Sequence, residues 1–437
     1  MSGQIANPTI IQSLASLVSR PVSEAIQERA ILHLIDWLGC AIAGSQEAVA
    51  KAAMRVRKDY ASSNAFYLGV LGNVLEMDDV DKRAILHPGP SIIPAALAMC
   101  LEDPERLNRL PEAIVSGYEA TIRLGRATGP GHYKLWHTTG TCGSVGAAAA
   151  CARLLQLSPA ETSHALALAM SQASGLWQTR HEPESMGKQL HTANAARSGV
   201  DSANLAAAGF KGPLSILEGQ QGFFAACAPE ADPKAVLLTY EHDWQIEQVS
   251  FKPWAACRHA HAAIDAALQL FEIGGDLTNV YQVEVGTYSD ALTFCDRPDP
   301  KSTIEAKFSL QHSVATVLIK GRPEITDFDS LSIDRQDIAE IRSKVSVQCG
   351  EPYASAYPAR YGAQVTIVFQ DGSQVSAEAP DALGDPENPL TKAQIHQKAY
   401  ALMDHAGVEQ NQSQQIIDKA ESLSSDLLVL IREHLLS

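Results

Sequence analysis

The sequence predicts a mainly α protein, with a large all-helical domain and a smaller α+β domain. We assign residues 1–244 together with residues 391–437 to the all-helical domain, and residues 245–390 to the α+β domain. Three observations predict this division. Apolar residues recur at helical spacing through the first 240 or so residues, β-branched residues begin to alternate near residue 245, and helical spacing returns after residue 390.

The helical region carries clear start and stop signals. One apolar series ends at Gly44 and consists of Ile31, Leu34, Ile35, Leu38 and Ile42. Ser158 and Glu161 form a capping-box pattern with Pro159 at the first helical position, which predicts a helix start there. Residues 140–155 and 192–209 consist largely of Ala, Gly and Ser, and such small faces let neighbouring helices approach closely. These two segments are expected at the centre of the helical domain.

The region from 245 to 390 mixes strand and helix patterns. Residues 280–289, 343–349 and 363–379 alternate β-branched residues, and Asp371-Gly372 lies between two strand-like runs as a hairpin turn would. Residues 256–275 and 308–321 have helical spacing between them. The C-terminal segments 390–407 and 413–436 are helical again, and we expect them to pack onto the first domain.

Length, charge and cysteine usage exclude several classes of protein. A chain of 437 residues is long enough for two domains with cores of their own. The formal net charge of -16 argues against nucleic acid or an anionic membrane as the main partner. The eight cysteines contain no CxxC pair, the N-terminus has no signal-peptide pattern, and no apolar run is long enough to span a membrane. We therefore expect a cytoplasmic, soluble protein.

The most unusual polar stretch is "LEMDDVDKRAILHPG", residues 75–89. It gathers Glu76, Asp78, Asp79 and Asp81, and His87 follows just before Pro88-Gly89. Such a group could be a metal site, an acid/base site or a polar loop without chemistry. No second set of ligands with suitable spacing occurs elsewhere, so we expect no metal, and most of these carboxylates are expected to position the loop or cap a helix.

Two further stretches place histidines at the starts of small-residue helices. His137 precedes Thr138 and Thr139, either of which could cap the helix that follows. Free N–H groups at a helix start, next to an imidazole, suit a carboxylate, although an ordinary loop histidine would give the same pattern. Lys188 and His191 enter the second helix, where a buried lysine would need an anionic partner and an exposed one would simply reach solvent.

The predicted α+β domain contains two comparable stretches. Lys252, Cys257, Arg258, His259 and His261 lie close together in sequence, but the two histidines are two positions apart and would point to different helix faces. The spacing matches no zinc signature. Lys307 and His312 lie near the start of an amphipathic helix, where a partly buried structural histidine is the simpler interpretation. The chain has no GxSxG elbow, P-loop or HExxH motif.

The order of these motifs resembles the MmgE/PrpD family over nearly the whole chain. The matching stretches are "HPGPSIIPAALA", "GYEATIRLGRA", "GHYKLWHTTGTCGSVGAAAACARLLQL", "GKQLHTANAARSGV", "FKPWAACRHAHAAIDA", "EAKFSLQHSVA", "YPARYGAQVTI" and "GDPENPLT". Members include 2-methylcitrate dehydratase, cis-aconitate decarboxylase and iminodisuccinate epimerase. The resemblance implies a helical domain, an α+β lid domain, a site between them and a homodimer, with no metal or organic cofactor for most members.

Residue by residue, the resemblance places family active-site positions on Glu76, His87, His137, Lys188 and Lys252. We expect the two lysines to hold substrate carboxylates and the two histidines to share proton transfer and charge stabilisation. The catalytic candidates are His87, His137, Lys188 and His312. The substrate-binding candidates are Glu76, Asp78, His191, Lys252 and Cys257.

The chain also departs from the family pattern. The usual "ALDFDDTH" becomes "VLEMDDVD", so Glu76 takes an Asp position, Val80 replaces a Thr and Asp81 replaces a His. In the decarboxylase branch a His falls on Cys257 and a Tyr on His312, which argues against a true cis-aconitate decarboxylase, although His312 could replace the phenol as an acid. The segment before residue 75 is also shorter than usual.

The resemblance implies proton transfer next to a carboxylate of a small di- or tricarboxylate. A 2-methylcitrate dehydratase-like hydro-lyase is the expected reaction. The alternatives are an epimerase of an iminodisuccinate-like dicarboxylate, a cis-aconitate-type decarboxylase, and a non-catalytic relative that binds polycarboxylates. The departures at Val80 and Asp81 motivate the last alternative, and the joint presence of the histidines and lysines argues against it.

Overall fold

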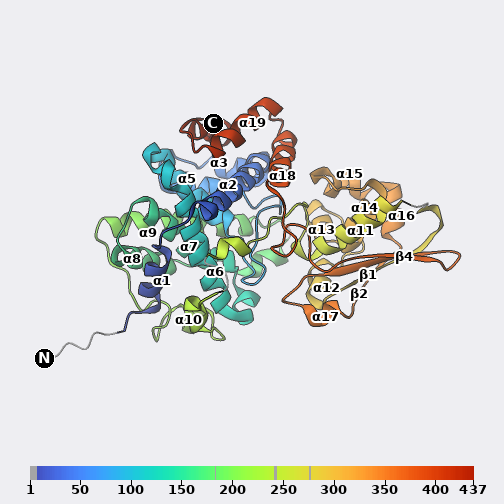
Figure 1. Ribbon diagram of the computed structural model, residues 1–437, viewed down its shortest axis with the longest axis horizontal. Helices are drawn as coiled ribbons and strands as arrows, with labels where there is room; N and C mark the ends of the chain where they lie inside the picture. The colour runs from blue at the N-terminus through green and yellow to red at the C-terminus, as the bar shows by residue number, and fades with distance from the viewer. Residues whose placement is uncertain (1–6, 183, 241–243, 275–276) are drawn as a thin grey trace. The chain divides into compact units, whose positions relative to one another are not determined.

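The computed structural model describes residues 7–182, 184–240, 244–274 and 277–437 (Figure 1). Residues 1–6, 183, 241–243 and 275–276 lie outside this description, and they include the last residue of the helical segment expected at 256–275. The chain divides into two compact units. The first unit comprises Met1–Val74, Asp78–Ser250 and Thr391–Ser437, and the second unit comprises Leu75–Met77 and Phe251–Leu390.

The first unit is helical throughout its described residues. Its α-helices are α1 (Ile10–Val18), α2 (Glu24–Gly44), α3 (Ala48–Met54), α4 (Ala61–Leu71), α5 (Gly89–Glu102), α6 (Leu110–Leu135), α7 (Thr138–Leu154), α8 (Pro159–Met170), α9 (Gly187–Ala207), α10 (Phe223–Cys227), α18 (Lys392–His405), α19 (Gln410–Glu421) and α20 (Asp426–Ile431). Short 3-10 turns lie between them: η1 (Pro104–Arg109), η2 (Trp177–His181), η3 (Pro233–Leu237) and η4 (Gln245–Gln248). A final π turn, η8, covers Arg432–Leu436.

Small residues form the centre of this unit, as the composition predicts. Helix α7 is buried along almost its whole length and packs against α6 and α9. A Cβ added at Gly199 of α9 would lie 2.3 Å from the Cβ of Ala147 in α7, so the two helices touch at a distance that only glycine permits. The predicted capping box at α8 is confirmed: Ser158 Oγ accepts from Glu161 N, and the Glu161 carboxylate accepts from Ser158 N.

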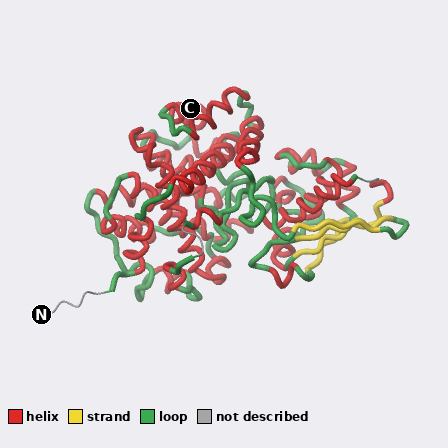
Figure 2. The backbone as a smooth tube through the Cα atoms, in the orientation of Figure 1, coloured by secondary structure: helices red, strands yellow, loops and turns green. Residues whose placement is uncertain are grey.

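The second unit contains the strands, which Figure 2 shows together in one sheet. The strands are β1 (Val280–Thr287), β2 (Val345–Cys349), β3 (Ala363–Phe369) and β4 (Gln374–Ala379), in the order β2-β1-β3-β4. β1 pairs with β2 in parallel and with β3 antiparallel, and β3 pairs antiparallel with β4. Asp371-Gly372 lies in the β3–β4 turn and Gly372 has a φ of 83°, so the predicted hairpin is confirmed.

In its described residues, the second unit also contains helices. They are α11 (His261–Ile273), α12 (Ser289–Cys295), α13 (Thr303–Lys307), α14 (Leu310–Lys320), α15 (Ser330–Ile333), α16 (Gln336–Arg342) and α17 (Tyr353–Ala356), with the 3-10 turns η5 (Arg258–Ala260), η6 (Leu277–Asn279) and η7 (Ile325–Phe328). α11 packs against β3 and β4, and α14 packs against β2. Val283, Val285, Val365 and Ile367 are buried at alternate positions, which gives the sheet one apolar face.

Some local predictions differ from the structure. Residues 245–250 belong to the helical unit, and Leu75–Met77 belongs to the α+β unit, which the hydrophobic pattern does not indicate. The expected capping of α7 by Thr138 or Thr139 is wrong, because His137 is the N-cap and both threonines lie inside the helix. The role of the second unit as a lid, the site between the domains and the homodimer stay predictions. Within the described residues, no helix is both long and apolar enough to cross a membrane.

Candidate active site

Asp79 anchors the acidic segment within the first unit. Its side chain is buried and accepts from Tyr118 Oη at 2.5 Å, from His33 Nδ1 at 2.7 Å and from Gly89 N at 2.9 Å. Gly89 is the first residue of α5, so Asp79 caps this helix from ten residues away. Burial lowers the pKa of His33 to about 4, and the ring is therefore neutral at physiological pH and donates to Asp79 through Nδ1.

Asp78 and His87 form an acid–imidazole pair in the same unit. His87 Nδ1 lies 2.8 Å from Asp78 Oδ2 and 3.0 Å from the carbonyl oxygen of Asp79. Both partners are acceptors, so Nδ1 carries a proton and donates to them. Asn73 Nδ2 donates to Asp78 at 2.7 Å, and His87 N donates to Thr139 Oγ1 at 2.9 Å. Thr139 therefore positions His87 and does not cap α7.

A second imidazole pair joins α7 to α9. The Nδ1 atoms of His137 and His191 are 3.2 Å apart, so one ring donates and the other accepts. The ring of His137 also packs against Trp177, with 4.4 Å between the ring centroids. Its backbone N–H donates to Gly175 O at 2.8 Å, which fixes the N-cap residue of α7.

Glycines make room for this pair. A Cβ at Gly140 would lie 3.1 Å from the Cβ of His191 and 2.6 Å from Ser174 O. Gly175 has a φ of 129°, and a Cβ there would lie 3.3 Å from the His191 ring. Both positions admit the imidazoles because they lack a side chain, which explains why glycines surround these histidines in the sequence.

The electrostatics of this region keep the imidazoles neutral. Burial lowers the pKa of His137 well below its usual value, and the charge of Lys188 and the neighbouring His191 and His87 lower it further, against an opposing effect of Asp78. Burial also lowers the pKa of His191 to about 4. The first unit thus holds Asp78, His87, His137, Lys188 and His191 in one neighbourhood, and the rings of His137 and His191 are neutral there. Neutral imidazoles can accept a proton near pH 7, and protonated ones can return it.

In the second unit, Glu76 and Lys252 lie close together and both are buried. Lys252 Nζ is 3.9 Å from Glu76 Oε2. Glu76 has a φ of 60°, and this left-handed conformation costs a residue with a side chain roughly 1–2 kcal/mol. Backbone strain of this kind persists only where surrounding contacts hold it, and it is frequent at functional sites.

Lys307 supplies such a contact. Its Nζ donates to Leu75 O at 3.1 Å, directly before Glu76, and its carbonyl oxygen accepts from Cys257 N at 2.8 Å. One buried residue of α13 therefore holds both the Glu76 backbone and the Cys257 backbone. Sequence reasoning placed Lys307 near a helix start but did not assign it to the site, because the partner lies 232 residues away in the chain.

Cys257 differs from the other buried cysteines. A hydrogen bond from the Cys295 thiol lowers the pKa of Cys257, and burial opposes this shift. The His259 N–H and the charge of Lys252 lower it further, whereas Glu76 raises it. Burial raises the pKa of Cys100, Cys142 and Cys151. Cys257 therefore belongs to the same polar cluster as Glu76 and Lys252.

His312 is placed differently from the other catalytic candidates. It is fully buried, its Nε2 lies 2.8 Å from Asp327 O, and its Nδ1 lies 3.3 Å from Arg342 Nη1. Nε2–H thus donates to a carbonyl and Nδ1 accepts from a guanidinium, so both ring nitrogens have partners. This geometry favours a structural role for His312, because proton transfer to a ligand would require a ring nitrogen to leave its partner.

His259 and His261 face different surroundings, as their spacing predicts. His259 stacks against Tyr361 and Phe294, and its Nδ1 lies 2.9 Å from Tyr288 Oη. His261 Nε2 lies 3.1 Å from Ala256 O. Across the residues that the structure describes, no group of three or more His, Cys, Asp or Glu side chains could hold a metal ion.

Two family models match this architecture. The MmgE/PrpD N-terminal domain matches residues 57–236, and the MmgE/PrpD C-terminal domain matches residues 254–423. The chain belongs to the MmgE/PrpD family. Both the helical and the α+β units are therefore MmgE/PrpD domains, and the eight sequence motifs that resemble the family lie in its two characteristic regions.

Three relatives of this chain have names that refer to cis-aconitate decarboxylase. Human cis-aconitate decarboxylase is 25% identical over 410 residues, which cover 86% of this chain and 83% of the relative. A cis-aconitate decarboxylase of Aspergillus terreus is 24% identical over 431 residues, covering 89% of this chain and 87% of the relative. A cis-aconitate decarboxylase-like protein of Aspergillus oryzae is 25% identical over 458 residues, covering 93% of each chain. At such identities the relatives support a related fold. The reaction of this MmgE/PrpD chain must be inferred from its own residues.

Sequence reasoning missed the supporting residues of this MmgE/PrpD chain. Asp79, Asn73 and Thr139 fix Asp78 and His87, and Lys307 fixes the Glu76 segment. The only signal for Asp79 was its place in a run of acidic residues directly before a Pro-Gly helix start. Thr139 had the right residue type for a polar contact, but its partner is His87, 52 positions earlier, and not a helix N–H.

Proposed function

We propose that this chain is a lyase that acts on a small di- or tricarboxylate by moving a proton at a carbon next to a carboxylate. The observation that carries the proposal is the group of imidazoles in the first unit that contact each other or a carboxylate beside a lysine. His137 and His191 share a hydrogen bond of 3.2 Å beside Lys188, and His87 is oriented by Asp78 at 2.8 Å. A structural scaffold has no need of His87, His137 and Lys188 together.

The chemistry of a carboxylate substrate explains this combination. Removing a proton next to a carboxylate builds negative charge, and a nearby ammonium group stabilises that charge. Lys188 is assigned to a substrate carboxylate, and Lys252 of the second unit is assigned to the same kind of role with Glu76 and Cys257 beside it. His137 and His87 are assigned to proton transfer. The mechanism uses no metal or organic cofactor, as the resemblance implies.

Dehydration is the reaction that we favour, with a 2-methylcitrate-like hydroxy acid as the substrate. One imidazole in its neutral form takes the proton from the carbon next to a carboxylate, the C–O bond breaks, a C=C bond forms, and a second imidazole in its protonated form gives a proton to the departing hydroxyl to give water. Dehydration requires a separate base and acid, and two imidazole pairs in one unit supply both. His312 takes no part in this scheme, since both its ring nitrogens have protein partners.

Decarboxylation of cis-aconitate is the second candidate, because the curated relatives named above are cis-aconitate decarboxylases. In that reaction a C–C bond breaks, carbon dioxide leaves, and one proton is delivered to the carbanion. A single proton donor is sufficient. The substitutions at Cys257 and His312, where the decarboxylase branch carries His and Tyr, argue for the first candidate.

The test is a substrate panel followed by proton NMR of the products. The purified chain is incubated with 2-methylcitrate, citrate, cis-aconitate, malate and iminodisuccinate, with and without EDTA. We expect an unsaturated tricarboxylate from 2-methylcitrate and unchanged turnover with EDTA. Release of carbon dioxide from cis-aconitate would favour the second candidate, and inversion of iminodisuccinate would show an epimerase.

Binding without turnover has a separate readout. A ligand that binds the folded state raises the melting temperature, so the same panel is run as a thermal-shift screen. A shift without turnover would show a non-catalytic binding protein. If no compound shifts the melting temperature and none reacts, the proposed function is wrong.

A further inference from the structure

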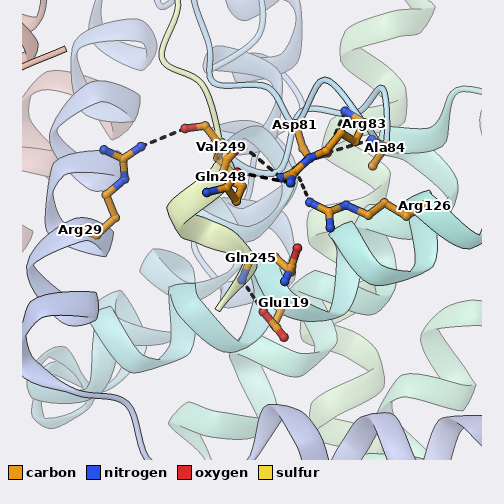
Figure 3. A network of polar contacts seen from close by, with 9 residues as sticks. All are labelled: Arg29, Asp81, Arg83, Ala84, Glu119, Arg126, Gln245, Gln248 and Val249. Carbon is orange, nitrogen blue, oxygen red and sulfur yellow. Dashed lines mark hydrogen bonds and ion pairs between the residues drawn. The ribbon is translucent and has the colours of Figure 1, made fainter. Parts of the chain in front are cut away.

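Asp81 lies at the centre of a polar network in the first unit, four residues past the strained Glu76 segment and six before His87. Figure 3 shows Arg83 and Arg126 both directed at its carboxylate, and Gln248 beside Arg83. Arg83 Nη2 is 2.9 Å and Arg126 Nη2 is 3.2 Å from Asp81 Oδ2. We propose that Asp81 is a positioning residue for His87, acting through the turn formed by residues 81–86. This inference rests on the proposed function, in which His87 carries a proton.

The turn is closed by Asp81 itself. Asp81 N donates to Leu86 O at 2.9 Å, and Leu86 N donates to Asp81 O at 3.3 Å. Asp81 Oδ1 also accepts from Arg83 N at 3.0 Å and from Ala84 N at 2.8 Å. One residue thus pairs with the turn's last residue through its backbone and with the turn's interior through its side chain. His87 follows Leu86 directly, so the end of this turn sets the position of the imidazole.

The turn needs this support because its backbone is strained. Ile85 has a φ of 49°, and a β-branched side chain in the left-handed region is a rare conformation. The four described residues other than glycine with positive φ are Glu76, Ile85, Gln156 and Leu423, so two of the four lie in the segment that leads to His87. A strained turn persists only when its surroundings hold it, and here the carboxylate of Asp81 does so.

The network ties this turn to two rigid elements. Arg126 belongs to α6, and Arg83 extends to Gln248 in η4, where Nη1 lies 3.4 Å from Oε1. The residues after η4 are held in turn, since Val249 O accepts from Arg29 of α2 at 2.9 Å (Figure 3). Ser250 also pairs with Val80 through both backbone groups. Glu119 of α6 accepts from Gln245 N at 2.7 Å. The turn is therefore fixed from α2 and α6.

Asp81 remains charged in this setting. Burial alone would raise the pKa of its carboxyl, but Arg83, Arg126 and the Ala84 N–H together hold that pKa below its usual range. A charged carboxylate that accepts from two guanidinium groups and two backbone N–H groups makes strong hydrogen bonds. The role of Asp81 in the turn is geometric. His87 Nδ1 must reach Asp78 and His87 N must reach Thr139, and both contacts depend on the position of the Leu86 backbone.

The first experiment compares Asp81→Asn with Asp103→Asn in the full chain. Asp103 is a matched control, because it also caps the N–H two residues on, at 3.2 Å from Glu105 N, and pairs with an arginine, at 3.3 Å from Arg106 Nε. We expect Asp81→Asn to lower kcat about 10- to 100-fold with a KM within about threefold of the wild type, since misplacing a reacting group by about 1 Å has such an effect. Asp103→Asn is expected to retain wild-type kcat.

A double-mutant cycle with His87→Asn separates positioning from general destabilisation. If Asp81 acts through His87, Asp81→Asn lowers kcat much less when His87 is already absent. Equal losses in both backgrounds would overturn the proposal. Ile85→Gly, which relieves the strain of the turn, is expected to restore part of the activity of Asp81→Asn, and its failure to restore any would also count against the proposal.

Hydrogen exchange supplies a readout that needs no substrate. Peptides covering residues 81–87 should exchange faster in Asp81→Asn and at the wild-type rate in Asp103→Asn, because the N–H groups of Arg83 and Ala84 lose their charged acceptor and the turn opens more often. Unchanged exchange would overturn the inference whatever the activity. If exchange changes as expected but the wild type turns over no polycarboxylate, the proposed function fails and the anchoring of His87 by Asp81 stands.

Discussion

The candidate histidines of the two units are held in different ways. In the first unit, His137 and His191 contact each other, and His87 contacts Asp78 and a carbonyl oxygen through one nitrogen only. In the second unit, both nitrogens of His312 are bonded to Asp327 and Arg342. The polar cluster there consists of Lys252, Glu76 and Cys257, with no imidazole among them.

This difference shows what distinguishes a reactive imidazole from a structural one. His137 and His312 are both buried, and burial lowers the pKa of the two rings alike. Burial and residue type are therefore uninformative by themselves. The partners of each ring nitrogen decide the role, because a nitrogen bonded to a backbone carbonyl and another bonded to a guanidinium leave nothing for a ligand. The comparison predicts proton transfer in the first unit and charge stabilisation in the second.

The largest expected effect is the loss of proton transfer in the first unit. His137→Asn keeps a polar side chain of similar size but removes the titratable ring, so we expect kcat to fall about 10²- to 10⁴-fold. His405→Asn is the control, since His405 is exposed at the end of α18. The measurement is kcat and KM on the substrate that the panel identifies. A His137→Asn variant with wild-type kcat would remove this residue from the mechanism.

The variant His312→Asn tests the same comparison in the second unit. If His312 is structural, the variant should lower the melting temperature and leave kcat of the folded fraction close to that of the wild type. A stable variant that has lost kcat would instead assign His312 to catalysis and weaken the rule drawn from its partners.

A smaller and different effect is expected from the lysine of the second unit. Lys252→Met removes a buried charge 3.9 Å from Glu76, and loss of one charge-assisted bond to a substrate carboxylate should raise KM about 10- to 100-fold. Lys344→Met is the control, because Lys344 belongs to the same unit but not to the candidate site, and its Nζ donates to Val280 O at 2.7 Å. A fall in kcat with unchanged KM would assign Lys252 to proton transfer. It would contradict the prediction that proton transfer belongs to the first unit and charge stabilisation to the second.

The sequence predicted the fold better than the site because the two depend on contacts of different range. The capping box of α8 and the β3–β4 hairpin are local, since their partners lie within a few residues. Apolar and small-residue patterns likewise indicate which helices are central. Each of these features can be found in a short window of sequence.

The contacts that define the candidate site span long stretches of chain. His137 and His191 are 54 residues apart, His33 and Asp79 are 46 apart, and Lys307 and Leu75 are 232 apart. The candidates were identified from the residue types in the sequence motifs. No sequence pattern could show that His312 would contact Arg342 or that Thr139 would accept a hydrogen bond from His87. The membership of Leu75–Met77 in the second unit is of the same kind, because three residues are too few to carry a periodic signal.

The smallest expected difference between the units is in their stability at acidic pH, because the effects of buried histidines and buried carboxyl groups partly cancel. Burial lowers the pKa of His33, His191 and His259 to about 4 from 6.5, so these rings take up protons more readily in the unfolded chain. Their contribution to stability is present above the unfolded pKa and is lost as the pH falls from about 6.5 toward 4. Burial raises the pKa of Asp36 and Asp265 to about 6, so these carboxyls take up protons more readily in the folded chain. Their protonation therefore stabilises the folded state as the pH falls from about 6 to 4.

The first unit contains His33 and His191 against Asp36, and burial also lowers the pKa of His137 in the same unit. The second unit contains His259 against Asp265, with a smaller contribution from His312. Acidification from pH 6.5 to 4.5 should therefore open the first unit before the second. Hydrogen exchange followed by peptide mapping, corrected for the pH dependence of the intrinsic rate, measures this order. Earlier loss of protection in the strands β1–β4 would contradict it and would show that the buried imidazoles of the first unit are better solvated than their contacts indicate.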